Sequence, residues 1–257
     1  MTEPAAHRKI GAHFRRGMAN YAAAADVQAQ IAVGLADAIA TAAPQQGYRQ
    51  GLEFGCGTGF LTRALQDRLC STNWLINDLL PEARAQVAPL FAGHTAWEFQ
   101  HGPVESLNLS RGFDLIAAAS AVQWVRDVPA LLARLSAALM PGGVLALSSF
   151  APGHFAELQA LVPAISTMSY HSAQEWQAML AALDLLEIGS ETCVQRFASP
   201  RDVLLHLRRT GVNATAKLPW SRGHLAAFEQ AYRQQFPDGR GGVTLTYAPV
   251  RVLARQR

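Results

Sequence analysis

The sequence predicts an α/β fold: a doubly wound, mostly parallel sheet of seven strands with an antiparallel edge strand and a helical cap. From about residue 51 to residue 150, short apolar runs alternate with stretches whose apolar residues have helical spacing. Such alternation is typical of parallel strands joined by helices that cover both faces of the sheet. After residue 150 the regular alternation gives way to helices with two strand-like segments among them. We assign these helices to the cap and the two strands to the sheet edge.

The first part of the chain supplies most of the predicted sheet. An Ala-rich stretch at 22–43 is interrupted by polar residues such as Asp26 and Asp37, which indicates an amphipathic helix and not a membrane span. A later helix is expected to stop at Pro141-Gly142-Gly143, because proline and glycine end helices. Strands are expected at 51–55, 74–77, 97–100, 113–118 and 144–150, and further helices at 60–69, from near Pro81, and at 128–139.

The second part of the chain contains the remaining predicted elements. Helices are expected at 155–165, 173–183, 200–210 and 221–236, and strands at 185–197 and 243–254. We expect the two strands to pair at one edge of the sheet, with the helical cap inserted between them.

Composition indicates a globular protein of the cytoplasm. Of the 257 residues, 50% are apolar and only 16% are charged, so a sizeable core is possible. The three cysteines, Cys56, Cys70 and Cys193, lie far apart without a C-x-x-C pair. They predict neither a metal site nor a disulfide framework, and they favour a reducing compartment. The first 16 residues are polar and basic, so we expect no signal peptide and no association with a membrane.

A glycine-rich turn is the strongest functional signal in the chain. Residues 53–59 read Glu-Phe-Gly-Cys-Gly-Thr-Gly, at the point where the first strand gives way to a helix. Glycines at Gly55, Gly57 and Gly59 allow the backbone to approach a ligand closely. In doubly wound folds, ligands bind at the carboxyl ends of the strands. We therefore expect a ligand at this turn, and not only a tight structural turn with solvated acids.

The acids around the turn indicate which ligand it holds. A dinucleotide-binding turn places a pyrophosphate at this position, and the carboxylate of Glu53 suits a pyrophosphate poorly but an ammonium group well. Asp78 follows the second strand, 19 residues after Gly59, where a carboxylate can bind two ribose hydroxyls. An adenosine that also carries a cation is S-adenosylmethionine, and we predict that cofactor. Cys56 has no visible catalytic partner, and we interpret it as a small filler of the turn.

These motifs resemble the class I methyltransferase superfamily, which has a Rossmann-like fold. The resemblance covers residues 48–150 and rests on the glycine turn, Asp78 and Pro141-Gly142-Gly143. It implies that Glu53 and the glycines face the methionine part of the cofactor and that Asp78 holds the ribose. It also implies cofactor contacts from Leu79, Val104, Glu105, Ser120 and Gln123.

A narrower resemblance extends over nearly the whole chain. The stretch from Phe14 through Tyr21 to Asp26-Val27-Gln28 is similar to the N-terminus of the malonyl-acyl carrier protein O-methyltransferases of biotin synthesis. Matching islands follow in the same order at Asn77-Asp78, 121–124, Gly153 with Glu157-Leu158, Leu207-Arg208, Gly211 and 245–247. One departure is Gly102-Pro103, where that family usually has Gly-Asp. An adenine contact from an aspartate is then missing, and backbone around Val104 or Glu105 is the substitute that we consider.

The resemblance implies methyl transfer from S-adenosylmethionine to the free carboxylate of malonyl-acyl carrier protein, which gives the methyl ester that primes biotin synthesis. A carboxylate with an ordinary pKa near 4 is already ionised at neutral pH, so the reaction needs no general base. The enzyme has to align the reactants and exclude water. Consistent with this, the sequence contains no catalytic dyad signature.

Several residues are assigned to substrate by the same resemblance. Tyr21 is expected to close over the active site as the catalytic residue, although a helix aromatic packed on the sheet would look the same in sequence. Arg208 is the first candidate for gripping the malonyl carboxylate, and Arg16 near Phe14 is the second; either can also be a solvated arginine. Trp124, like Gln123, is expected to hold the methionine end of the cofactor or to line the thioester channel, although a core residue of a strand–helix junction would look the same. Cap arginines give a surface suited to an acidic carrier protein, with malonyl-coenzyme A as a possible second substrate.

Domain organisation and rival functions complete the prediction. We expect one methyltransferase domain over 1–257, in which 1–45 form a helical lid, 46–150 the cofactor-binding half, and 151–257 the edge strands with the cap. The main alternative is another small-molecule carboxyl or carbon methyltransferase, of the aconitate or quinone-pathway type. A non-catalytic cofactor-binding protein is disfavoured by the intact turn. A nucleic-acid partner is disfavoured because the sequence has no N/D-P-P-Y motif and no arginines interleaved with aromatics.

Overall fold

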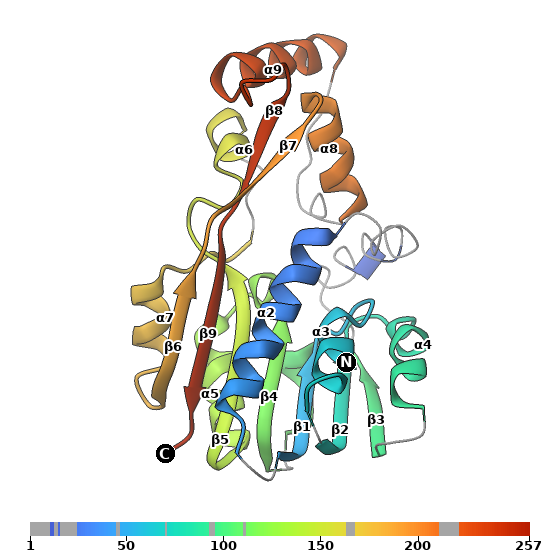
Figure 1. The fold of residues 1–257 in the computed structure, drawn as a ribbon, viewed down its shortest axis with the longest axis vertical. Coiled ribbons are helices and arrows are strands. Elements are labelled where there is room, and N and C mark those ends of the chain that lie inside the picture. Colours follow the sequence, from blue (N-terminus) through green and yellow to red (C-terminus); the bar gives the residue numbers. More distant parts are fainter. Residues whose placement is uncertain are drawn as a thin grey trace. The chain divides into compact units, whose positions relative to one another are not determined.

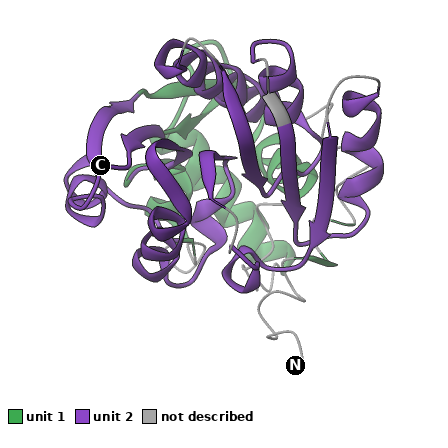
Figure 2. Cartoon of the chain, turned by 90° about the horizontal axis from the view of Figure 1, so that it is seen from below, with its two compact units in different colours: residues 1–25, 152–168, 191–249 green, residues 26–151, 169–190, 250–257 purple. Residues whose placement is uncertain are grey.

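The chain forms two compact units in a computed structural model. Unit 1 comprises 1–25, 152–168 and 191–249, and unit 2 comprises 26–151, 169–190 and 250–257 (Figure 2). The residues described are 11–12, 15, 25–44, 47–69, 71–92, 96–109, 112–162, 168–210 and 221–257, with only the backbone at 71–72.

Unit 2 contains a seven-stranded sheet in the order β3-β2-β1-β4-β5-β9-β6 (Figure 1). β1 pairs in parallel with β2 and β4, and β5 pairs in parallel with β4. The last strand, β9, lies between β5 and the edge strand β6, and it is antiparallel to β6. The mostly parallel sheet with an antiparallel pairing at one edge is therefore confirmed. Its strands are β1 (Tyr48–Phe54), β2 (Ser71–Asp78), β3 (Ala96–His101), β4 (Phe113–Ala119), β5 (Leu139–Phe150), β6 (Asp184–Ser190) and β9 (Pro249–Arg255).

Alternation along the central parts of the strands builds a core on each face of this sheet. On β1, Leu52 and Phe54 belong to a cluster that includes α5 (Val128–Ala138) and α7 (Ala173–Met179). On β4, Leu115 and Ala117 belong to the other cluster, together with α2 (Asp26–Ala42) and α3 (Phe60–Gln66). Side chains of a strand point to opposite faces in turn, so helices cover both faces, as the sequence predicts. The remaining helices of unit 2 are α4 (Ala83–Val87) and the 3₁₀ turns η1 (Ala88–Phe91), η2 (Val104–Ser106) and η3 (Val122–Trp124).

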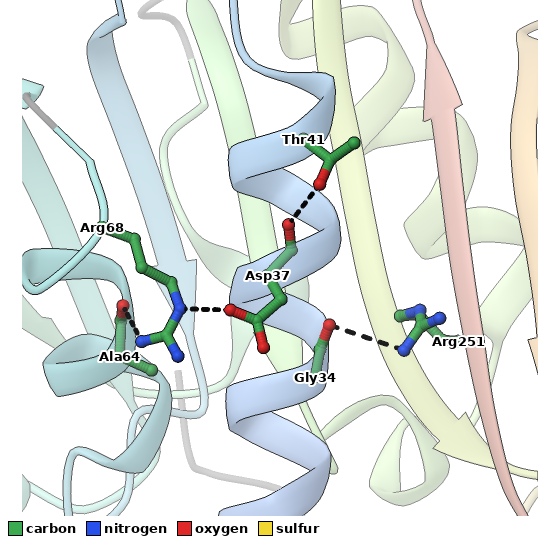
Figure 3. A network of polar contacts seen from close by, with 6 residues as sticks. All are labelled: Gly34, Asp37, Thr41, Ala64, Arg68 and Arg251. Carbon is green, nitrogen blue, oxygen red and sulfur yellow. Dashed lines mark hydrogen bonds and ion pairs between the residues drawn. The ribbon is translucent and has the colours of Figure 1, made fainter.

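Polar contacts fix α2 along its length (Figure 3). The Asp37 carboxylate accepts from Arg68, 2.6 Å away beyond the end of α3, and Arg68 also donates to the Ala64 carbonyl at 3.0 Å. On the other side, Arg251 of β9 donates to the Gly34 carbonyl at 3.5 Å. Near its C-terminal end, the Ile39 carbonyl accepts from the Tyr48 hydroxyl at the start of β1, at 3.4 Å. α2 is therefore held to α3, β1 and β9.

Unit 1 contains a second, two-stranded sheet and, among its described residues from 152 onward, three helices. β7 (Cys193–Phe197) and β8 (Val243–Tyr247) pair antiparallel. The buried Glu157 carboxylate accepts from the Thr246 backbone at 2.9 Å and from the Thr246 hydroxyl at 2.7 Å. An ion pair between Arg201 and Glu229 joins two of the helices. The three helices are α6 (Ala156–Leu161), α8 (Pro200–Arg209) and α9 (Arg222–Gln235).

The late strands differ from the sequence prediction. The single strands expected at 185–197 and 243–254 are each two strands, β6 with β7 and β8 with β9. The breaks fall at Glu191-Thr192 and at Ala248, where the chain leaves one sheet for the other. The prediction was wrong because it ran each strand through residue types that are depleted in strand interiors, Gly189 with Glu191 in one segment and Pro249 in the other. The helices expected between the strands are present.

The start of β5 also corrects the prediction. α5 ends at Ala138, before Pro141-Gly142-Gly143, but the strand already begins at Leu139 and runs through that motif to Phe150. The extra residues form a bulge, because Phe113 pairs with Leu139 whereas Leu115 pairs with Val144. Proline is tolerated in a strand at such irregularities. Among the helices that the structure describes, none is long and apolar enough to cross a membrane.

Candidate functional site

The glycine turn follows directly after β1. Gly55, Gly57 and Gly59 all have positive φ angles, of 67°, 53° and 84°, which residues with a Cβ rarely adopt. A Cβ on Gly55 would lie 2.4 Å from the Cβ of Ala121, after β4. At Gly57, by contrast, a Cβ would meet no described atom within 4 Å. Gly55 thus permits close packing of the turn, while Gly57 leaves space beside it for a ligand.

Asp78 braces the turn from the end of β2. Its Oδ2 accepts from the Gly57 amide at 2.8 Å and its Oδ1 accepts from the Leu80 amide at 2.8 Å. The side chain is nearly buried, and burial raises the pKa of Asp78, an effect that the two amides oppose. A carboxylate has about four acceptor sites, so two are left for ribose hydroxyls.

Glu53 lies near the end of β1, on the face covered by α2 and α3. The side chain is 1% exposed, and its Oε2 has no hydrogen-bond partner among the described residues. Burial raises the pKa of Glu53 from 4.5 to about 8, although Thr62 on α3 opposes the shift. Leaving a buried acceptor without a donor is costly, which indicates that Glu53 faces a cationic ligand.

Two further predicted residues, Ser120 and Gln123, follow β4. Ser120 has a φ of 53°, held by hydrogen bonds from its amide to the Ser148 carbonyl at 3.1 Å and hydroxyl at 3.2 Å. Gln123 donates from Nε2 to the Ser120 carbonyl at 2.7 Å. In the described part of the chain, neither the Ser120 hydroxyl nor Gln123 Oε1 finds a partner, although both are buried. Backbone strain with free polar atoms is typical of a ligand site.

The turn at Val104 and Glu105 corresponds to the expected adenine side. Arg134 of α5 donates to the carbonyls of Val104, Glu105 and Leu107, the last at 2.7 Å. The preceding Pro103 has no amide hydrogen to donate. Because the carbonyls already accept from Arg134, the amides are the groups of this turn best suited to an adenine ring.

The predicted cofactor residues are therefore brought together within unit 2. Glu53, the three glycines, Asp78, Ser120 and Gln123 all lie at the C-terminal ends of β1, β2 and β4, with Leu79 and Val104 beside them. The acceptor oxygens of Glu53 and Gln123 that lack a described donor suit an ammonium group. The Asp78 carboxylate suits the hydroxyls of a ribose, and Gly57 leaves space for a ligand beside the turn. These groups fit S-adenosylmethionine.

The residues predicted for the substrate are distributed differently. Trp124 ends η3 in unit 2 and is partly buried, next to Gln123. Arg208 is exposed in the last turn of α8, in unit 1. Phe14, Arg16 and Tyr21 lie outside the described residues.

Three residues of the site were not predicted from the sequence. Arg134 shapes the Val104 turn, Thr62 adjoins Glu53, and Gln28 is buried in α2 with an Oε1 that has no hydrogen-bond partner among the described residues. Arginine and threonine on a helix carry no local signal of such roles. Gln28 belongs to the Asp26-Val27-Gln28 stretch that carries the family resemblance. Its burial in the structure is what distinguishes it from the exposed Gln30.

Comparison with known proteins identifies the family. A family model described as "Methyltransferase domain" matches residues 27–186. The malonyl-[acyl-carrier protein] O-methyltransferase of Porphyromonas gingivalis is 34% identical over 94% of this chain and 93% of its own length. The chain belongs to the malonyl-[acyl-carrier protein] O-methyltransferase family. The relative of the same name from Prosthecochloris aestuarii is 35% identical over 93% of this chain and 89% of its own.

Solved structures confirm the methyltransferase fold. N-methyltransferase NodS from Bradyrhizobium japonicum, in complex with S-adenosyl-L-homocysteine, has a TM-score of 0.59 over 96% of this chain and 98% of its own. At 13% identity the similarity concerns the fold alone. Within the methyltransferase, burial raises the pKa of the Cys56 thiol, which disfavours a thiolate and agrees with its interpretation as a filler. The part of the chain that the structure describes contains no cluster of three metal-ligating side chains.

Proposed function

We propose that this methyltransferase transfers the methyl group of S-adenosylmethionine to the free carboxylate of malonyl-acyl carrier protein, which gives a methyl ester for biotin synthesis. The observation that carries the proposal is the set of buried acceptor oxygens beside the glycine turn that find no partner among the described residues, in a chain that matches its relatives over nearly its full length. The cofactor, when bound, supplies an electrophilic methyl group on a sulfonium.

The protein's own residues bind the cofactor and orient it toward the accepting carboxylate. Glu53 and Gln123 offer acceptors for the ammonium of the cofactor, and Asp78 offers acceptors for the ribose. No residue has to remove a proton, because the accepting carboxylate is already ionised. Holding the two reactants in line is itself worth effective molarities on the order of 10⁵ M or more. We therefore assign this site to alignment and to exclusion of water, and not to acid–base catalysis.

The charge of unit 1 supports an acyl carrier protein as the partner. Unit 1 contains 12 Lys and Arg residues against 6 Asp and Glu, whereas unit 2 contains 10 against 13. On α8, Leu205 is 42% exposed, and Arg208 and Arg209 follow it within one turn on the same exposed side. An apolar side chain next to two cations complements an acidic helix that carries apolar residues. We infer that the carrier protein docks on this stripe, defined as Leu205, Arg208 and Arg209. Leu205 and Arg209 contact the carrier protein itself, whereas Arg208 contacts the malonyl group that it carries.

The remaining substrate contacts are part of the same proposal. Arg208 grips the malonyl carboxylate, with Arg16 as the second candidate, and Phe14 and Trp124 line the thioester channel. Tyr21 closes over the reactants as part of the lid at 1–45, and residues 46–150 form the cofactor-binding half. Residues 151–257 supply the edge strands and the substrate cap. Location in the cytoplasm and acceptance of malonyl-coenzyme A are further predictions of this proposal.

The test is methyl transfer from labelled S-adenosylmethionine to purified acyl carrier protein. Malonyl-acyl carrier protein should be labelled, whereas the acetyl form, which lacks a free carboxylate, should not. The succinyl form has the carboxylate one methylene further away and should react more slowly. Equal rates with malonyl and succinyl forms would contradict the assigned substrate. Labelling of aconitate or of a quinone precursor in its place would favour the alternative small-molecule activity.

A further inference from the structure

Gln28 is a buried polar residue in a stripe that is otherwise apolar. The buried residues Ala32, Leu35, Ala36 and Ile39 of α2 recur at helical spacing and belong to the core cluster on this face of the sheet. Gln28 continues the stripe one turn toward the N-terminus and is only 7% exposed. Its Oε1 is buried without a partner in the described part of the chain. A core position gives no reason for an amide, and burying one without a donor is unfavourable.

The contacts of α2 place Gln28 at the level of Glu53. Ile39 contacts Tyr48 at the start of β1. From Ile39 back to Gln28, α2 rises about 17 Å at 1.5 Å per residue. From Tyr48 to Glu53, β1 rises about 17 Å at 3.3 Å per residue. Because α2 descends the sheet while β1 ascends it (Figure 1), the two side chains reach the same end of the sheet.

Three elements therefore each supply one acceptor oxygen at the end of the sheet where β1 and β4 finish. Glu53 Oε2 comes from β1, Gln123 Oε1 from the turn after β4, and Gln28 Oε1 from the first turn of α2. All three residues are more than nine-tenths buried. A primary ammonium group carries three N–H donors, and three acceptors of this kind match it.

We propose that Gln28 Oε1 is a third acceptor for the ammonium group of the cofactor, beside Glu53 and Gln123. This inference rests on the proposed function, since it takes the ligand to be S-adenosylmethionine or its product. It makes Gln28 a binding residue that recognises the amino-acid end of the cofactor and contributes nothing to recognition of the adenosine end.

Calorimetric binding of two ligands tests this assignment. S-adenosylhomocysteine carries the ammonium group, whereas 5′-methylthioadenosine retains the adenosine and lacks it. In Gln28→Leu, which conserves volume, affinity for S-adenosylhomocysteine should fall about tenfold or more, as expected for one hydrogen bond to a charged group. Affinity for 5′-methylthioadenosine should change less than about twofold. The matched control is Gln30→Leu, an exposed glutamine two residues further along α2, which should leave both affinities unchanged.

A second variant distinguishes the ammonium from the neighbouring carboxylate of the cofactor. Gln28→Glu keeps an acceptor and should retain the affinity for S-adenosylhomocysteine within a few-fold. If Gln28 instead donated to the cofactor's carboxylate, Gln28→Glu would bind more weakly than Gln28→Leu, and the inference would be overturned. Equal losses for both ligands in Gln28→Leu, or no loss for either, would also overturn it. Failure of the wild-type protein to bind S-adenosylhomocysteine would refute the proposed function itself.

Discussion

Single residues of the glycine turn have different reasons for being glycine. Gly55 and Gly57 share a left-handed backbone conformation, but only Gly55 faces a close neighbour, the Cβ of Ala121. The two positions therefore separate packing from ligand space. The sequence predicted that both are glycines of a binding turn, yet it contains no information on which neighbour each one meets.

Alanine substitutions should separate these two roles. Gly57→Ala should lower the unfolding free energy only by the backbone strain, about 1 kcal/mol. Its methyl group would lie where the ligand is expected. Gly55→Ala should lower the unfolding free energy by the same strain and by about 1–3 kcal/mol more, because its methyl group overpacks against Ala121. Chemical denaturation should thus rank Gly55→Ala as the less stable variant, and calorimetry should find weakened cofactor binding in Gly57→Ala. Adding Ala121→Gly to Gly55→Ala should restore the overpacking part alone, and no restoration would contradict the packing role.

Glu53 should make cofactor binding depend on pH. Its pKa of about 8 in the free protein means that it is mostly protonated at neutral pH. Pairing with an ammonium group favours the ionised form, so binding releases a proton below about pH 8. Affinity for S-adenosylhomocysteine should rise with pH from about 6 to 8, by up to tenfold per unit, and then level off. Calorimetry in buffers of different ionisation enthalpy measures the released proton directly.

The same shift has a defined sign for stability. In the ligand-free protein the raised pKa contributes stability that is fully present below the ordinary value of 4.5 and is lost as pH rises through about 8. Glu53→Gln should remove both the proton release and this loss, whereas Glu98→Gln on β3 should change neither. Proton release that persists in Glu53→Gln would assign the effect to another group, with Asp78 as the first candidate.

At the scale of elements, periodicity predicted the sheet better than it predicted where strands change partners. The first five strands along the chain, β1 to β5, and the helices between them follow from alternation of apolar runs. The division of 185–197 and 243–254 depends on which sheet each half joins, and that is decided by packing of distant segments. Gln28 and Arg134 escaped prediction for the same reason, since an unpaired oxygen or a contact to a distant carbonyl exists only after folding.

The exposed stripe on α8 should separate recognition of the acyl group from recognition of its carrier. Arg208→Ala should raise the KM for malonyl-acyl carrier protein and for malonyl-coenzyme A alike, because both present the same carboxylate. Arg209→Glu should raise the KM for malonyl-acyl carrier protein about tenfold and leave malonyl-coenzyme A nearly unchanged. Cofactor affinity should stay constant in both variants. Loss of cofactor affinity in Arg208→Ala would show that the cap has been assigned wrongly.

At the scale of the whole molecule, the two units carry opposite net charge. The excess of Lys and Arg in unit 1 and of Asp and Glu in unit 2 is hidden in the formal net charge of +3. Association with an acidic partner that is steered by unit 1 weakens with ionic strength, because the Debye length falls from about 10 Å at 0.1 M to about 3 Å at 1 M.

Steady-state kinetics at increasing salt should therefore show a falling kcat/KM for malonyl-acyl carrier protein. The KM for S-adenosylmethionine should change much less, since the side chains that we assign to its ammonium group and ribose are buried in unit 2. In Arg209→Glu the salt dependence should be shallower. A salt dependence that is equally steep for both substrates would indicate a general effect on the enzyme, and would count against steering by unit 1.

The position of β9 between β5 and β6 also sets an order of events during protein synthesis. β6 is complete at Ser190, but its neighbour β9 begins only at Pro249, after 58 intervening residues. At translation rates of about 5–20 residues per second, that interval lasts roughly 3 to 12 s. Throughout it, the backbone of β6 lacks β9, the strand with which it pairs in the finished sheet. A ribosome that pauses in this interval therefore leaves a strand edge open to pairing with another chain.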